Sequence, residues 1–184
     1  MVLIAFVLIT SVSFYLAGII SENQNWHEMI QSLGLIGIIL VSIVTGLNAF
    51  VPIPPATFAP IFLEVGVPSY VVIGGFVIGT TIADSIGFYI GTLGRNYAHH
   101  NFSRAMAYTH SLIQKHKALI PFLILSFFML APLPNETILI PLAIMGYKYK
   151  KLILPLIFGN IIHQTIMVYG YSSVFTWFFK LSNE

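Results

Sequence analysis

Two carboxylates in this sequence lie in the middle of long apolar stretches. Asp84 is near the centre of the apolar run from Tyr70 to Leu93, and Glu136 follows a proline cluster in the run from Ala118 to Gly146. An ionisable side chain at the centre of a bilayer costs at least ~2.5–3.5 kcal/mol, so it is treated first as a functional residue. Because apolar surroundings disfavour a charged carboxylate, its protonation can follow conformation. Both residues are therefore candidates for a proton relay or an ion site.

Three further polar residues, Asn160, His163 and Gln164, lie near the centre of the last apolar run, Leu152–Phe179. We expect them to approach the two carboxylates and to form with them one site for substrate binding and ion coupling. Helices that cross a membrane keep such side chains turned toward the protein interior or toward water.

Each ionisable residue also has a structural interpretation. Asp84 could bond to the backbone of a broken helix and so fix the fold. Glu136 could be the first residue of a helix, where the helix dipole favours a negative charge. His163 could be a buried neutral imidazole that hydrogen-bonds to a carbonyl group.

The composition restricts the class of protein. The chain has 184 residues, of which 57% are hydrophobic and 8% charged, and its mean hydropathy is +0.89. Soluble domains are about 25% charged, so we predict a single all-α integral membrane domain. The net charge of +2 does not indicate a nucleic-acid partner, and the absence of cysteine excludes disulfides and thiolate metal sites. No cofactor or metal is predicted.

Two proline clusters interrupt the apolar runs, "FVPIPP" at Phe50–Pro55 and "LAPLPNE" at Leu130–Glu136. Proline removes a backbone donor, and a broken helix at membrane depth is tolerated only where protein or a water-filled cavity surrounds it. Both clusters look like the tips of helical hairpins, where a new helix starts and points its free N–H groups inward. Such a start can bind an anion or can be satisfied by Glu136. The tip residues are Pro52, Pro54, Pro55, Thr57, Pro132, Pro134, Asn135 and Thr137, with Asn135 as a helix cap.

The positions of Lys and Arg predict the topology. Cytoplasmic loops are rich in these residues, and both Gly94–Lys117 and Tyr147–Lys151 are basic. The stretch between them must then enter and leave on one side, as a re-entrant hairpin. The cytoplasmic end of the protein would then have a basic mouth formed by Arg95, Lys148, Lys150 and Lys151. These residues either set the topology and meet anionic lipids, or they gather a phosphorylated substrate.

A shift of 80 residues superimposes the two halves of the chain. It pairs Pro52 with Pro132, Pro54 with Pro134, Thr57 with Thr137, Gly66 with Gly146, Gly79 with Gly159 and Tyr89 with Tyr169. We predict an inverted repeat, the architecture of many secondary transporters. The predicted parts are an N-terminal transmembrane helix (1–20), a polar loop (21–32), repeat 1 (33–93, with hairpin 33–66 and crossing 70–93), a cytoplasmic amphipathic segment (94–117) and repeat 2 (118–179, with hairpin 118–146 and crossing 152–179).

The chain resembles the DedA-like, VTT-domain membrane proteins of the SNARE-associated Golgi protein superfamily. The resemblance rests on "FVPIPP", on "GTTIADSIGFYIGTLGR" (Gly79–Arg95) and on "PLPNETILIPLAIMGY" (Pro132–Tyr147). It implies re-entrant hairpins and the movement of phospholipids or polyprenyl-phosphate lipids. The chain resembles an atypical Pro-Leu-Pro variant of this family. It has Pro55–Ala56–Thr57 where typical members have an acidic residue just after a Pro-Gly pair, and its second hairpin lacks their arginines. The arginine-based recognition of phosphate therefore does not transfer.

These features predict a transporter or flippase that moves a lipid phosphate, coupled to protons through Asp84 and Glu136. A passive phospholipid scramblase and a transporter of a small soluble anion are the alternatives. An enzyme is not expected: membrane aspartyl proteases need two aspartates and the chain has only Asp84, while Ser85 and His163 lack a supporting motif. The expected partners are membrane lipids, among them polyprenyl phosphate, and protons. A homo-oligomer is open, and a prokaryotic plasma membrane is the expected location.

Overall fold

The protein is all-helical wherever its structure is described. A computed structural model describes residues 2–47, 53–95, 107, 111, 115, 119–130 and 134–182, and these residues contain helices and turns but no strand. Three helices are long and apolar enough to cross a membrane: α2 (Gln24–Gly46), α4 (Ser69–Leu93) and the Tyr149–Val174 part of α9 (Tyr149–Ser182). The prediction of an all-α, membrane-embedded protein is confirmed at this level.

Shorter helices complete the chain. They are α1 (Val2–Glu22), the 3-10 helix η1 (Pro55–Phe58), α3 (Ala59–Glu64), α7 (Ile120–Leu130) and α8 (Glu136–Ile144). Pro52, Pro132 and most of the predicted amphipathic segment 94–117 lie outside the described residues.

The polar loop predicted over residues 21–32 is wrong. Only Asn23 interrupts the helices there, and its Oδ1 accepts hydrogen bonds from the backbone N–H groups of Asn25 (3.1 Å) and Trp26 (3.3 Å). The segment is polar because one side of the helix is exposed, and an asparagine N-cap lets α2 start within it. The actual break comes later, at Gly34, whose φ of +47° kinks α2.

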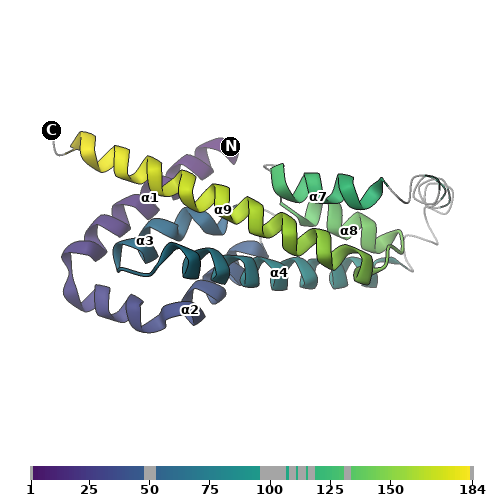
Figure 1. Cartoon of the computed structure of the whole chain (residues 1–184), viewed down its shortest axis with the longest axis horizontal. Coiled ribbons are helices and arrows are strands. Elements are labelled where there is room, and N and C mark those ends of the chain that lie inside the picture. Colours follow the sequence, from purple (N-terminus) through teal and green to yellow (C-terminus); the bar gives the residue numbers. More distant parts are fainter. Residues whose placement is uncertain are drawn as a thin grey trace.

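Helices α4 and α9 lie side by side along most of the long axis of the molecule (Figure 1). Helices α1, α2 and α3 surround one half of the α4–α9 pair, and α7 and α8 surround the other half. The long pair is therefore the frame on which the two proline-containing segments are mounted.

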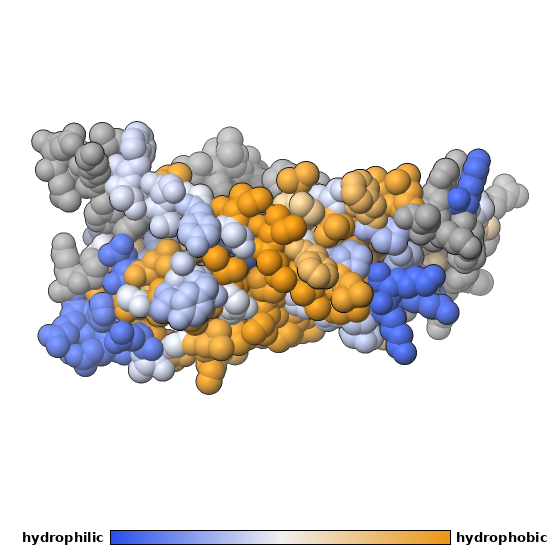
Figure 2. Space-filling view, in the orientation of Figure 1, coloured by the Kyte–Doolittle hydropathy of each residue, from blue (hydrophilic) through white to orange (hydrophobic). Residues whose placement is uncertain are grey.

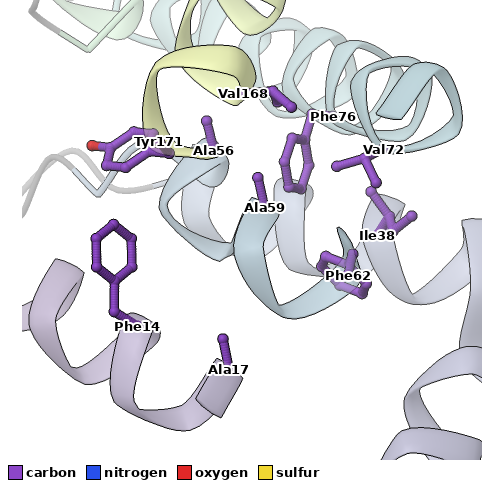
Figure 3. Packing of buried hydrophobic residues seen from close by; sticks show 10 residues of the cluster. All are labelled: Phe14, Ala17, Ile38, Ala56, Ala59, Phe62, Val72, Phe76, Val168 and Tyr171. Carbon is purple, nitrogen blue, oxygen red and sulfur yellow. The ribbon is translucent and has the colours of Figure 1, made fainter. Parts of the chain in front are cut away.

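Two apolar clusters fill these two halves. The first core cluster consists of Phe14, Ala17, Ile38, Ala56, Ala59, Phe62, Val72, Phe76, Val168 and Tyr171 (Figure 3). The second core cluster consists of Phe88, Ile124, Phe128, Leu139, Leu142, Ala143, Leu152 and Leu156. Along α4 the first cluster precedes the second, and along α9 the order is reversed. The two long helices are therefore antiparallel, and the residues between the clusters lie halfway along both.

A stripe of small residues lets other helices approach α4 closely. Gly75, Gly79, Ala83, Gly87 and Gly91 follow each other at intervals of four residues and are all buried. A Cβ atom at Gly79 would lie 2.4 Å from Cβ of Ser42 in α2, and one at Gly91 would lie 2.8 Å from Cβ of Ala143 in α8. One stripe thus receives both α2 and α8, as small residues do in membrane helix interfaces.

The surface separates an apolar middle from two polar ends. Figure 2 shows hydrophobic residues across the central part of this face and hydrophilic residues gathered near both ends of the long axis. Exposed aromatic residues at the end where α4 begins include Trp26, Tyr70 and Trp177. Aromatic side chains of this kind are enriched where a membrane meets water, as is expected if α4 and α9 cross a membrane along the long axis.

Candidate functional site

A hydrogen-bonded polar cluster lies halfway along α4 and α9, and we define it as Thr81, Asp84, Asn135 and Asn160. Oδ2 of Asp84 accepts hydrogen bonds from Nδ2 of Asn160 (2.9 Å) and from Nδ2 of Asn135 (3.0 Å). Asn135 Nδ2 also donates to Oδ1 of Asn160 (3.2 Å), and Asn160 Nδ2 donates to Oγ1 of Thr81 (3.3 Å). The cluster therefore joins α4, α9 and the start of α8 through side chains alone.

The structure places Asp84 and Asn160 deep in the protein, with 3% and 2% of their surface exposed. Thr81 and Asp84 are three residues apart, so they share one face of α4. Asp84 meets side-chain amides, whereas the structural alternative considered above was a bond to hairpin backbone. Two amide donors stabilise a carboxylate that water cannot reach.

The expected capping role of Asn135 is wrong. Asn135 does occupy the position before α8, but its φ and ψ of −59° and −28° are already helical and its side chain makes no capping bond. The amide is instead directed at Asp84 and Asn160, which lie across the interface from the hairpin tip. The Nδ2 group of Asn135 needs an acceptor, which the carboxylate of Asp84 and the side-chain oxygen of Asn160 supply.

Glu136 lies beside the polar cluster as the first residue of α8. Its exposure is 8%, and its side chain packs on Gly87 of α4, where an added Cβ would lie 3.1 Å from Cγ of Glu136. Its carboxyl bonds to its own backbone N–H and is an electrostatic neighbour of Asp84. Its Oε1 is buried and has no hydrogen-bond partner among the described residues. Glu136 thus occupies the helix start and also approaches the second carboxylate.

Gln164 and His163 follow Asn160 along α9, and their side chains have different surroundings. Gln164 is 3% exposed and lies one turn beyond Asn160, between the polar cluster and Val168 of the first core cluster. Its Oε1 is also buried without a partner in the described part of the chain. The His163 ring hydrogen-bonds to the backbone of Met129 in α7. His163 is therefore not bonded to the carboxylates, and its contact matches the structural interpretation of that residue.

The two hairpin tips share a backbone bond and differ in their surroundings. The N–H of Thr57 donates to the carbonyl of Pro54, and the N–H of Thr137 donates to the carbonyl of Pro134, both at 3.0 Å. Thr57 is completely buried, and its hydroxyl also bonds to the Pro54 carbonyl. Thr137 is exposed. Pro55 is the first residue of η1 and is buried.

The predicted basic mouth lies at the end of the molecule where α4 ends and α9 begins, which we call the basic end. The Arg95 guanidinium lies over the turn at Gly146, where an added Cβ would be 2.6 Å from Nη2. Lys148, Lys150 and Lys151 are exposed at the start of α9. These four residues are separated from the polar cluster by the second core cluster.

Sequence reasoning missed three residues of this region, namely Thr81, Gly87 and Ser13. Thr81 and Gly87 precede and follow Asp84 by three residues, and this helical spacing was a signal that could have found them. Ser13 had no such signal, since its bond to the carbonyl of Thr57 (2.5 Å) joins distant parts of the chain.

The geometry gives no support to a Ser–His catalytic pair or to a metal site among the described residues. Ser85 hydrogen-bonds to the carbonyl of Thr81 (2.6 Å) and to the hydroxyl of Tyr149 (2.5 Å), so it is not paired with His163. No group of three His, Cys, Asp or Glu residues is placed to hold a metal ion within the described ranges. The four histidines of the 94–117 segment lie outside those ranges.

Comparison with known proteins gives no relative: the chain matches no protein-family model, no curated protein and no solved structure.

Proposed function

We propose that this protein is a DedA-like transporter of the plasma membrane that moves a lipid phosphate, polyprenyl phosphate or a phospholipid, across the bilayer and couples this movement to protons. The observation that carries the proposal is the pair of neighbouring buried carboxylates, Asp84 and Glu136, at a helix start halfway along two antiparallel apolar helices. Transporters with inverted repeats bind their substrates and coupling ions at such interrupted helices.

The repeat is supported by backbone bonds that recur after 80 residues. Gly66 and Gly146 have φ values of +82° and +84°. The N–H of each donates to the carbonyl three residues earlier, at 3.0 Å in both turns. The next residue, Val67 or Tyr147, donates to the carbonyl five residues before it, at 3.1 or 2.9 Å. This pair of bonds is a Schellman helix end, which favours glycine. Helices α4 and α9 then start at Ser69 and Tyr149, again 80 residues apart.

The lengths and contacts of the hairpin arms support re-entry. Helix α7 has 11 residues and α8 has 9, which gives ~16 Å and ~14 Å of helix against a hydrocarbon core of ~30 Å. Phe128 of α7 packs on Gly159, and Glu136 of α8 packs on Gly87. Both arms thus reach the level of the polar cluster and stop there.

The first hairpin repeats this arrangement from the other end. After the kink at Gly34, the remainder of α2 to Gly46 spans ~18 Å. Gly46 lies against Ala83 of α4, where an added Cβ would be 2.7 Å from Cβ of Ala83. The chain then returns through η1 and α3. The contacts of α2 and of α8 with α4 thus begin at opposite ends of α4 and meet near its middle, which supports the proposed inverted repeat.

Charge balance favours proton exchange at the carboxylate pair. Arg95 lies eleven residues after Asp84, which is ~16 Å along the helix, so it does not neutralise the pair. Two neighbouring carboxylates in apolar surroundings are too costly to ionise together. We therefore propose that the pair always keeps one proton, and that the gain or loss of a second proton is the coupling step.

The choice of a lipid phosphate rests on the basic end and on the resemblance to the DedA-like proteins. Arg95, Lys148, Lys150 and Lys151 gather positive charge where the headgroups of anionic lipids would lie. This charge attracts the phosphate group to the basic end, while Asp84 and Glu136 couple its movement to protons.

Lipid movement in proteoliposomes tests the proposed function. Fluorescent polyprenyl phosphate and a phospholipid are followed separately in vesicles with the wild-type protein, with and without an imposed pH gradient, and in vesicles without protein. Movement of either lipid that depends on the gradient supports the proposal. Movement that is equal without a gradient identifies a passive scramblase, and no movement above empty vesicles contradicts a lipid substrate and directs the search to soluble anions.

A further inference from the structure

The two hairpin tips are held in the protein by different kinds of contact. Tip 1 (Pro54–Thr57) is covered by α1: Ser13 donates to the carbonyl of Thr57 at 2.5 Å, and Phe14 and Ala17 join the first core cluster around it. None of these contacts involves a charged side chain. The attachment of tip 1 is therefore independent of protonation.

Tip 2 is attached through the carboxyl group of Asp84. Asn135, the last residue before α8, bonds by its amide to Oδ2 of Asp84 and to Oδ1 of Asn160. Asn160 in turn donates to the same Oδ2. Both donors therefore converge on one carboxylate oxygen, and a carboxylate accepts stronger hydrogen bonds than a neutral carboxylic acid does.

The corresponding positions of the first repeat lack this attachment to Asp84. The residues 80 positions before Asn135 and Asn160 are Pro55 and Thr80. Pro55 has no side-chain amide, and the Thr80 hydroxyl bonds to the carbonyl of Phe76 in its own helix (2.7 Å). The matched threonines differ too, since Thr57 is fully buried and Thr137 is exposed. Only the second hairpin has an amide connection to Asp84 within the described residues.

We propose that Asn135 and Asn160 are positioning residues that sense the charge of Asp84, and that the second hairpin, not the first, moves when Asp84 is protonated. The two amides clamp the tip while Asp84 is ionised. A proton on Asp84 replaces charge-assisted bonds by weaker neutral ones, and the start of α8 is released from the α4–α9 pair. This inference deepens the proposed function by naming the part of the protein that coupling moves.

The other titratable groups around Asp84 do not supply an alternative clamp. Glu136 lies near Asp84 at the start of α8 and, as a second carboxyl group, offers it no positive charge. His163 on α9 is directed to the backbone of Met129, and Tyr149 at the start of α9 bonds to Ser85. The parts of α2, η1 and α7 that are described contribute no acidic or basic side chain at this level.

Hydrogen–deuterium exchange of the full-length protein in nanodiscs tests the inference, with Glu136–Ile144 compared with Pro55–Glu64 in each sample. Asp84→Asn keeps the shape of the side chain and removes its charge. We expect exchange in α8 to become roughly 10-fold faster, from the difference between charged and neutral hydrogen bonds, and exchange in η1 and α3 to stay unchanged. Ser13→Ala is the matched control, and it should loosen the first hairpin alone.

A double variant and a pH series separate charge sensing from a merely structural bond. Asn135→Ala should also loosen α8, and adding Asp84→Asn to it should cause little further change, because both act through one contact. In the wild type, acidification should speed α8 exchange after correction for the chemical rate, and in Asp84→Asn it should not.

Equal loosening of both hairpins, or unchanged α8 exchange in Asp84→Asn, would overturn the inference. These outcomes are separate from the transport assay. If exchange changes as expected but no lipid moves, the inference about Asn135 and Asn160 stands and the lipid substrate is contradicted. If lipid movement follows the gradient but exchange is unchanged, the proposed function stands and the inference is contradicted.

Discussion

The close approach of α2 to α4 leads to a prediction about two glycines that lie five residues apart in α4. An added Cβ at Gly79 would lie 2.4 Å from Cβ of Ser42 and 2.7 Å from the backbone oxygen of Ile39, whereas one at Gly74 would meet nothing within 4 Å. Carbon atoms normally stay about 3.5–4.0 Å apart. The two positions therefore distinguish the packing of the small-residue stripe from the general effect of glycine in a helix.

The expected magnitudes follow from two opposing terms. Alanine is more favourable than glycine in a helix by about 0.8–1.0 kcal/mol, so Gly74→Ala should stabilise the protein by up to that amount. Gly79→Ala gains the same term but must push α2 back by about 1 Å, and overpacking of this kind costs about 1–3 kcal/mol. Because one obstructing atom belongs to the backbone of α2, no side-chain rotation relieves the contact. The free energies of unfolding of the two variants should differ by about 2 kcal/mol.

Unfolding of both variants and the wild type in one detergent, followed by circular dichroism, measures this difference. We expect the order Gly74→Ala, wild type, Gly79→Ala, from the most to the least stable. If Gly79→Ala were as stable as Gly74→Ala, α2 would not lie on this face of α4, and the placement of the first hairpin would be wrong.

Two further predictions concern the turns and the topology. Gly66→Ala and Gly146→Ala should each destabilise the protein by about 1–2 kcal/mol, because both turns need a positive φ; a much larger loss at Gly146 would mean that Arg95 cannot move away from the added Cβ. Since the wild-type chain has no cysteine, Lys150→Cys and Glu28→Cys can be labelled with a membrane-impermeant maleimide. The proposed topology predicts labelling from opposite sides of the membrane, and labelling from the same side would refute it.

Part of this architecture was open to prediction from the sequence. Glycine at 66 and 146 and proline at 54 and 134 mark turns whose backbone bonds repeat, because these residues restrict the backbone locally. The starts of α4 and α9 were likewise close to their predicted positions, since long apolar runs fix where a crossing begins.

Other features depend on contacts between segments that are distant in the chain. Asn135 was expected to cap α8. Its side-chain amide instead hydrogen-bonds to Asp84, and this contact depends on the packing of α8 against α4. The cover that α1 gives to Thr57 through Ser13 had no local signal. The helix that starts after Asn23 was missed because its exposed side is polar, and polarity alone does not distinguish a loop from a surface helix.

Gradient-driven lipid movement in matched proteoliposomes tests the central claim, that the buried carboxylate pair couples transport to protons. Asp84→Asn and Glu136→Gln are compared with the wild type and with Glu64→Gln, which neutralises an exposed carboxylate at the end of α3. We predict that both buried variants lose the movement driven by the pH gradient while Glu64→Gln keeps it. Full gradient-driven movement in Asp84→Asn and Glu136→Gln would contradict the account, because the pair would then carry no coupling proton.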